Sequence, residues 1–242
     1  MNFCKNIKKR KLDYILTMEN QNSSEDKNEK SEKNSKKSDD YYNESSSDKV
    51  EVKSYKNHIY FYCSVTKKSC LQLNMELHEI AQGIISNGKN HLDKNKFIYI
   101  HINSFGGSVF AALSVIDTIK SLPVPTVSII EGGAASAATM ISVSCTYRIM
   151  RENSFMLIHQ LSSSCWGKMN DLEEEMQNLK KLMKKIKSIY KGHTKLQESE
   201  LGEILKHDFW WDCKKCLSSG LVDEIKESVK LIYPIDSSLI NC

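Results

Sequence analysis

The sequence predicts an α/β domain with a largely parallel sheet, preceded by a polar N-terminal tail. From about residue 58 onward, short runs of β-branched and aromatic residues alternate with segments whose apolar residues recur at helical spacing. The order strand, helix, strand implies a right-handed parallel crossover. Residues 19–49 carry no aliphatic side chain, so they cannot bury enough apolar surface to fold. We expect a disordered tail at 1–57, a folded domain at 58–230 and a C-terminal tail at 231–242.

Strands and helices alternate through the first half of the predicted domain. The strand candidates are short β-branched or aromatic runs at residues 58–62, 97–102 and 126–130. The helix candidates cover residues 71–85 and 109–119. Ser108 precedes the second helix, where its hydroxyl oxygen can accept a hydrogen bond from a backbone N–H of the first turn.

The second half of the domain contains the clearest helix. A turn at 131–133 leads into a helix of small residues at 134–141, and strands are predicted at 148–150 and 155–159. The long helix that follows, at about 168–192, repeats its apolar residues every 3.5 positions, which is typical of a helix that packs along another helix. These apolar residues are Met169, Leu172, Met176, Leu179, Met183, Ile186 and Tyr190. The chain ends with a helix near 199–205, an aromatic segment at 209–211 and the segment 220–225.

Composition and charge exclude several classes of function. The net charge is +4 over 242 residues and Lys is matched by Glu and Asp, so no nucleic-acid stripe is expected. The basic residues 8–11 are either a localisation signal, a polyanion contact or a solvated basic end. No apolar run is long enough to span a membrane. The lack of a secretory signal favours a cytoplasmic location, while the basic, acid-free residues 1–12 leave an organellar one open.

Eight cysteines are scattered along the chain without the spacing of a disulfide scaffold, so free thiols are expected. Cys213-Lys-Lys-Cys216 has the spacing of half a metal or redox site. No second pair of Cys or His residues lies at ligand spacing, which favours thiols that act as small packed residues. We therefore expect no metal and no cofactor.

A serine with the surroundings of a nucleophile lies in Gly132-Gly-Ala-Ala-Ser-Ala-Ala138. Ser136 follows a strand and a glycine turn and enters a helix, where unpaired backbone N–H groups can bind an oxyanion. The alternative is that Ser136 is a small residue that packs among alanines.

Three further segments fit the same chemistry. Gly106 and Gly107 follow a strand and let the backbone approach a ligand. His159 ends an apolar strand, where a buried imidazole needs a partner, although a structural hydrogen bond would satisfy it equally. Asp208 adjoins the aromatic segment 209–211, which can shield it enough to orient an imidazole; the alternative is a solvated carboxylate before a helix.

Four segments resemble, in order, the signature blocks of the Clp protease proteolytic subunit (ClpP) family. The similarity covers roughly residues 59–227. It implies a ClpP/crotonase-like spiral of ββα units with a protruding helical handle at about 168–192. The blocks are Ile102-Asn-Ser-Phe-Gly-Gly-Ser108, Gly133-Ala-Ala-Ser136, Met156-Leu-Ile-His-Gln160 and Gly220-Leu-Val-Asp223.

The resemblance also implies a serine endopeptidase with Ser136 as nucleophile, His159 as general base and Asp208 as the third triad member. An ungapped count back from Gly220 selects Asp208 and not Asp212. The backbone N–H groups of Gly107 and Ala137 match the family's oxyanion donors, and no cofactor or metal is implied.

The family's assembly implies the partners. Unfolded polypeptides would be hydrolysed inside stacked heptameric rings, made of this chain alone or mixed with paralogues. A separate AAA+ unfoldase would supply them in an ATP-dependent step. No nucleic acid and no membrane is expected as a partner.

Several positions depart from the family pattern. Phe105 and Leu161 replace two prolines, and residues 162–167 contain fewer glycines than the family's strand after the histidine. These changes bear on substrate preference and ring geometry more than on the reaction. Two alternatives stay open: an inactive ring subunit with a structural role, and a crotonase-type acyl-CoA enzyme, against which the absence of a basic adenine-phosphate site argues.

Overall fold

The computed structural model describes residues 52–87 and 97–226. The predicted disorder at 19–49, the basic residues 8–11 and the C-terminal tail at 231–242 lie outside the described residues. Within them, strands and helices alternate as an α/β chain, and the predicted fold class is confirmed.

In the described part of the chain, eight strands form one sheet. They are β1 (Lys53–Tyr55), β2 (His58–Phe61), β3 (Ile98–Ser104), β4 (Thr126–Ala135), β5 (Tyr147–Arg151), β6 (Phe155–Leu157), β7 (Trp210–Trp211) and β8 (Glu224–Lys226). The main order is β1-β2-β3-β4-β5-β8, and β6 and β7 extend from the second half of β4. All neighbours pair in parallel except β1 with β2 and β6 with β7.

The described helices are α2 (Lys67–Asn87), α3 (Val109–Ser121), α4 (Ala137–Val143), α5 (Met169–His193), α6 (Glu198–Ile204) and α7 (Cys213–Ser218). Helices α2, α3 and α4 connect the paired parallel strands β2 to β5, as the crossover rule requires, and α5, α6 and α7 follow. Ser108 caps α3 as predicted, because its side chain accepts a hydrogen bond from the Ala111 N–H. None of the helices in the described part of the chain combines the length and apolar character that a membrane crossing requires.

The start of the folded domain and the segment at 131–136 differ from the sequence prediction, and the helix predicted from residue 134 begins at Ala137. The folded domain begins before residue 58, since β1 at 53–55 pairs with β2 and Val52 is buried. The turn predicted at 131–133 is wrong: β4 continues to Ala135, with only Gly132 at a positive φ of 78°. The strand persists there because its second half finds partners in β3 and β6.

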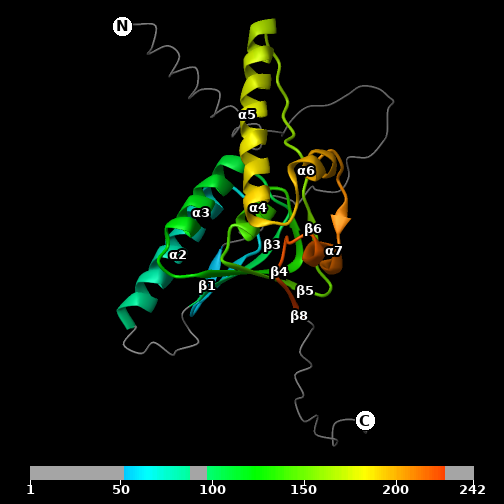
Figure 1. The fold of residues 1–242 in the computed structure, drawn as a ribbon. Helices are drawn as coiled ribbons and strands as arrows, with labels where there is room; N and C mark the ends of the chain where they lie inside the picture. The colour runs from blue at the N-terminus through cyan, green and yellow to red at the C-terminus, as the bar shows by residue number, and fades with distance from the viewer. Residues whose placement is uncertain (1–51, 88–96, 227–242) are drawn as a thin grey trace, which may run out of the picture. The chain divides into compact units, whose positions relative to one another are not determined.

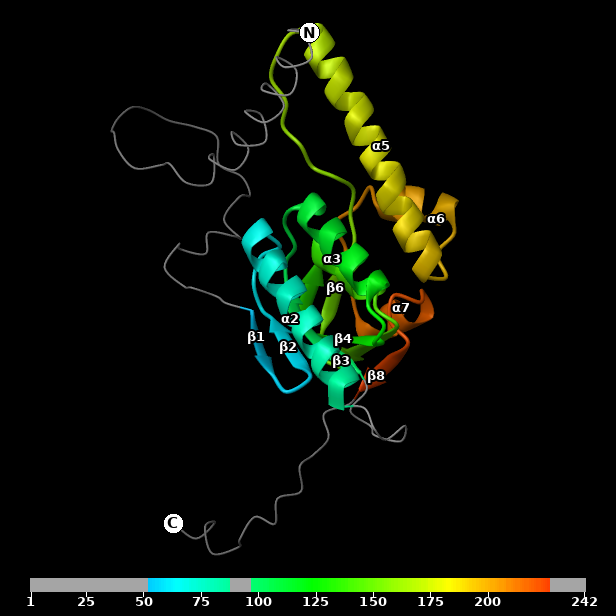
Figure 2. The ribbon, with the colours of Figure 1, turned by 90° about the vertical axis from the view of Figure 1, so that its left-hand side faces the viewer.

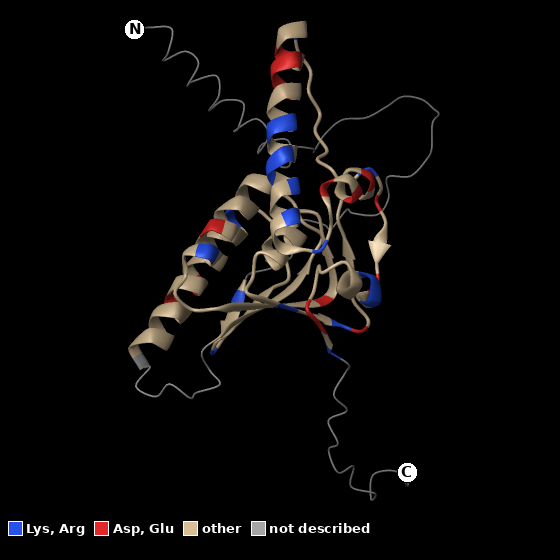
Figure 3. Ribbon diagram, viewed as in Figure 1, with Lys and Arg blue, Asp and Glu red and all other residues tan. Residues whose placement is uncertain are grey.

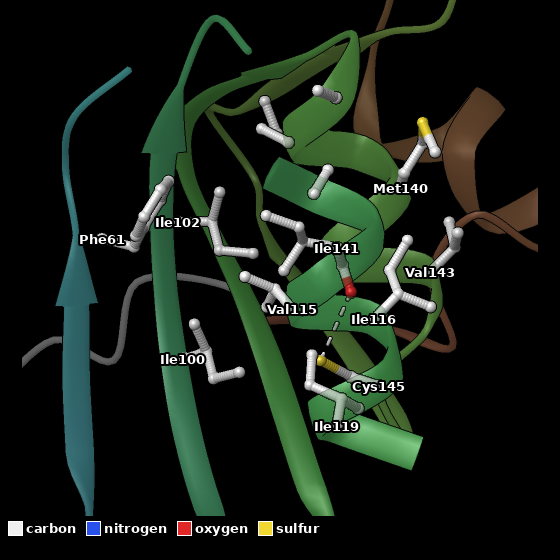
Figure 4. Packing of buried hydrophobic residues seen from close by; sticks show 14 of the residues in the cluster. Phe61, Ile100, Ile102, Val115, Ile116, Ile119, Met140, Ile141, Val143 and Cys145 are labelled. Carbon is white, nitrogen blue, oxygen red and sulfur yellow. Dashed lines mark hydrogen bonds between the residues drawn. The ribbon is translucent and has the colours of Figure 1, made fainter. Parts of the chain in front are cut away.

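The hydrophobic core lies between the sheet and helices α2, α3 and α4, with α2 and α3 side by side over one face (Figure 2). Alternate residues of β3 enter this core, and in Figure 4 Ile100 and Ile102 point toward the apolar side of α3. The intervening residues face the other side of the sheet, where Ile129 and Ile149 form a smaller cluster with Val127.

Helix α5 extends away from the sheet (Figure 1), and only its C-terminal part is buried. Ile186, Ile189 and Tyr190 are at most 5% exposed, whereas Met169 and Met176, near the other end, are 71% and 52% exposed. Acidic residues lie toward its first turns and basic residues farther along (Figure 3). The apolar stripe predicted from the sequence is therefore covered at one end and open to solvent at the other.

Candidate active site

The pairing of β4 with β6 brings Ser136 and His159 to one edge of the sheet. Ala135 pairs with Leu157, each the last residue of its strand, and the two strands are parallel. The first N–H after β4, that of Ser136, donates to the Leu157 oxygen at 2.9 Å. Since the carboxyl ends of parallel strands meet at the same edge, the segments that follow the two strands emerge together.

The antiparallel pairing of β6 with β7 adds Asp208 to this edge. Leu157 pairs with Trp210, so the residue two places after Leu157 faces the residue two places before Trp210. These are His159 and Asp208, and the Asp208 Oδ1 lies 3.4 Å from the His159 Nδ1. The His159 side chain is 25% exposed and the Asp208 side chain 77%. Residues far apart in the sequence are therefore brought together by backbone register.

Ser136 occupies a strained turn between β4 and α4. Its φ of 54° and ψ of −126° lie in a region that residues other than glycine seldom adopt. Such a conformation costs about 1–3 kcal/mol and is concentrated at functional sites. Ser136 is the residue before α4, but its side chain does not cap that helix. Its hydroxyl accepts no hydrogen bond from the backbone N–H groups of the first turn.

The glycine pair between β3 and α3 lies directly against Ser136. A Cβ on Gly106 would come within 2.7 Å of the Ser136 Cβ and 3.0 Å of the Ala137 nitrogen. A Cβ on Gly107, at a φ of 143°, would be 2.4 Å from the Val65 oxygen. Only glycine permits so close an approach, so the two loops can share one small site.

Two backbone N–H groups of this site are candidates to bind an oxyanion. The Val65 N–H donates to the Gly106 oxygen and the Ser108 N–H donates to the Val65 oxygen. In such a parallel bridge the intervening residue, Gly107, directs its own N–H to the opposite side. Ala137 is the first residue of α4, where a backbone N–H has no partner within the helix.

The structure separates the two aspartates near β7. Asp212 is the N-cap of α7, and its Oδ1 accepts from the Lys215 N–H at 2.8 Å. Asp208 is the one beside His159. Among the described residues, no hydrogen bond joins the Ser136 hydroxyl to the His159 ring, and such contacts often tighten only when substrate is bound.

Two contacts, one near the site and one distant from it, were not anticipated from the sequence. Phe105 and Trp210 stack edge to face with ring centroids 5.9 Å apart, and both rings lie near Gly133. The Arg148 guanidinium donates two hydrogen bonds to the Asp223 carboxylate and a further one to the Gly220 oxygen at 2.9 Å. The last signature block therefore holds β5 to the segment before β8, away from the chemistry.

The described residues offer no site for a metal ion: no group of three or more His, Cys, Asp or Glu side chains has a suitable arrangement. Cys216 is fully buried, and burial raises the pKa of its thiol to about 12. A thiol that stays protonated is a poor metal ligand and a poor nucleophile. This agrees with a packed small residue at that position.

Comparison with known proteins places the chain in a family. The Clp protease family model matches residues 57–229. The chain belongs to the Clp protease family. It is 34% identical over 143 residues to an ATP-dependent Clp protease proteolytic subunit of Streptococcus mutans, covering 57% of this chain and 73% of the relative. It is 30% identical over 144 residues to proteolytic subunit 3 of Rhodococcus jostii, covering 59% of this chain and 71% of the relative.

A solved structure supports the same fold. A variant of ClpP1 from Listeria monocytogenes superposes with a TM-score of 0.62 at 22% identity, covering 72% of this chain and 93% of that one. The ClpP-like fold predicted from the resemblance is confirmed, and the chain is a member of a family of proteolytic subunits.

Proposed function

We propose that this chain is a serine endopeptidase subunit that cleaves unfolded polypeptides, with Ser136 as nucleophile, His159 as general base and Asp208 as the group that orients the imidazole. The proposal rests on the register of β4, β6 and β7, which brings the three residues to one edge of the sheet. At that edge the Asp208 Oδ1 lies 3.4 Å from the His159 Nδ1. With Nδ1 turned to the carboxylate, Nε2 is the ring atom left to accept the serine proton.

The proposed reaction is acyl transfer to Ser136 followed by hydrolysis. His159 takes the Ser136 proton as Oγ attacks the peptide carbonyl carbon, and the N–H groups of Gly107 and Ala137 bind the oxyanion that forms. Protonated His159 then gives its proton to the leaving amine, and the peptide C–N bond breaks. Water attacks the ester by the same route, which releases the carboxylic acid and restores the serine.

The partners follow from the family and from α5. We propose stacked heptameric rings, of this chain alone or mixed with paralogues, in which the exposed apolar residues near the start of α5 contact a second ring. Unfolded polypeptide would be supplied by a separate ATP-dependent AAA+ unfoldase. Met169, Leu172 and Met176 are 71%, 39% and 52% exposed, and this apolar surface favours a partner of similar character.

A second candidate, an inactive ring subunit, has one observation in its favour. The Asp208 side chain is 77% exposed, and an aspartate so open to water orients an imidazole weakly. Ring contacts that cover Asp208 would favour the active subunit.

Labelling with a fluorophosphonate distinguishes the two candidates. The full chain should be labelled at Ser136 and should hydrolyse a short fluorogenic peptide. Ser136→Ala should lose both, whereas Ser142→Ala, which removes a hydroxyl from the neighbouring α4, should retain both. A wild-type chain that is assembled but neither labels nor cleaves would support the inactive subunit.

A further inference from the structure

Two buried hydroxyl groups connect α5 to the backbone of Ser136. The Tyr190 Oη lies 2.7 Å from the Thr139 Oγ1, and the Thr139 Oγ1 lies 2.6 Å from the Ser136 carbonyl oxygen. Tyr190 is 1% exposed and Thr139 is fully buried. Both side chains are closed to water, so their hydroxyl groups depend on protein partners for their hydrogen bonds.

The direction of these hydrogen bonds follows from the number of protons. A carbonyl oxygen only accepts, so the single hydroxyl proton of Thr139 is donated to Ser136. Thr139 can then only accept from its other neighbour, and Tyr190 is the donor of the second bond. The chain of donation runs from Tyr190 through Thr139 to the Ser136 carbonyl, and successive bonds of this kind strengthen one another.

The carbonyl that receives this chain belongs to the same peptide group as the Ala137 N–H. A peptide group is planar and trans, so its oxygen and its hydrogen point in opposite directions. Holding the Ser136 oxygen toward Thr139 therefore fixes the direction in which the Ala137 N–H points. That N–H is one of the two proposed oxyanion donors.

Ser136 also needs such support because its backbone is strained. Its N–H is held by the Leu157 oxygen at 2.9 Å, and its carbonyl is held by the Thr139 N–H at 3.0 Å as well as by the Thr139 hydroxyl. A residue at a φ of 54° keeps that conformation only where its surroundings fix both sides. Thr139, supported by Tyr190, holds the carbonyl group of Ser136 in place.

We infer that Thr139 and Tyr190 are positioning residues for catalysis: they orient the Ser136–Ala137 peptide so that its N–H binds the oxyanion. The role rests on the proposed function, in which Ser136 is acylated. This role differs from simple packing of α5 on α4. It predicts that loss of either hydroxyl lowers kcat by an amount unrelated to the loss of thermal stability.

The test uses the full chain with hydroxyl-deletion variants, measuring kcat and KM on a short fluorogenic peptide, the fluorophosphonate labelling rate, thermal stability and sedimentation. Tyr190→Phe should lower kcat and the labelling rate about tenfold with KM unchanged, less than the loss of a direct oxyanion donor. Thr139→Val should lower them more, and Thr139→Ser, which keeps the hydroxyl, should restore them to near the wild-type values. Ser142→Ala is the matched control, since its buried hydroxyl, 2.9 Å from the Ser128 hydroxyl, is also on α4 but does not contact Ser136.

A double variant separates positioning from stability. Thr139→Val leaves the Tyr190 hydroxyl buried without a partner, and adding Tyr190→Phe removes that group and should recover stability. Because the hydrogen bonds connect Tyr190 to Ser136 through Thr139, the double variant should keep the low kcat of Thr139→Val. Recovery of kcat together with stability, a wild-type kcat in Tyr190→Phe, or a kcat loss that follows loss of assembly would each overturn the inference.

The wild-type chain supplies the remaining comparison. If it is not labelled at all, the proposed function fails, and the positioning role fails with it. If it is labelled and Tyr190→Phe is labelled at the same rate, the proposed function stands and only the positioning role is overturned.

Discussion

The Asp208 Oδ1 lies 3.4 Å from the His159 Nδ1, while Asp212, four residues later, caps α7. Two carboxylates close in sequence therefore have different partners, an imidazole for Asp208 and a helix N-terminus for Asp212. The difference is set by β7, which ends the segment that carries Asp208 and precedes the helix that Asp212 caps.

Substitution of the two aspartates should show which of them supports catalysis. Asp208→Asn should lower kcat by about 10³–10⁴-fold through loss of imidazole orientation, with little change in stability. Asp212→Asn should leave kcat nearly unchanged, because asparagine is also a good N-cap. Peptide hydrolysis and thermal unfolding of both variants check this, and the opposite ranking of kcat would assign the third triad position to Asp212.

Charges on the exposed stripe of α5 should separate stacked rings. Leu172→Glu with Met176→Glu places two charges where we propose contact with a second ring, and burying unpaired charges costs several kcal/mol. Sedimentation should show smaller particles while circular dichroism keeps the helical signal. Asn170→Glu with Asn178→Glu adds the same charge to another side of α5 and should leave sedimentation unchanged. Equal behaviour of the two double variants would contradict the proposed interface.

Phe105 should select apolar substrate side chains. Its ring is 55% exposed, packs against Trp210 and belongs to the loop that touches Ser136. Phe105→Ala should raise KM about fivefold for peptides with aromatic residues at the cleavage site, since an aromatic contact contributes about 1 kcal/mol. KM for a peptide with alanine there should not change. An equal rise for both peptides would indicate a general distortion of the glycine loop.

Stability should fall in acid partly through Glu131. Burial alone would raise the pKa of this carboxyl, but a hydrogen bond from Tyr62 and the nearby His101 and Arg151 hold the pKa below its ordinary value. A depressed pKa stabilises the fold above the unfolded value of about 4.5, and this contribution is lost as the pH falls through the folded pKa. The effect is therefore largest at neutral pH.

The variant Glu131→Gln tests this contribution. At pH 7 it should lower the free energy of unfolding by about 1–3 kcal/mol, because its partners lose a charged acceptor. The gap to the wild-type chain should narrow below about pH 4.5. Urea unfolding at several pH values measures it, with the exposed Glu152→Gln as control. A gap that stays constant with pH would rule out a contribution from the carboxylate charge.

Much of the fold and site could be predicted because their signals are local. Apolar spacing placed α2, α3, α5 and α6 within a few residues of their observed bounds, and short β-branched and aromatic runs identified the strands that precede Ser136 and His159, although not where those strands end. Parallel strands bring such ends to one edge, so the two residues could be expected near each other. Ser108 was recognisable as a cap because capping depends only on its own turn.

The features that could not be predicted depend on pairing between distant segments. Gly132 and Gly133 have the local signature of a turn, yet pairing with β6 keeps them in β4. Lys53–Tyr55 is too short and polar to be recognised alone and becomes a strand through β2. Thr139 and Tyr190 are 51 residues apart, and each by itself has the pattern of an ordinary buried helix residue.

The dependence of the site on strand register also determines which kinds of sequence change it tolerates. Leu157 and Trp210 pair through their backbones, so other side chains at these positions would still deliver His159 and Asp208 to the same edge. One residue inserted or removed between Leu157 and His159 would turn the imidazole to the opposite face, because side chains alternate along an extended chain. The geometry of this site is therefore robust to substitution in the strands that form it and intolerant of any change in their length.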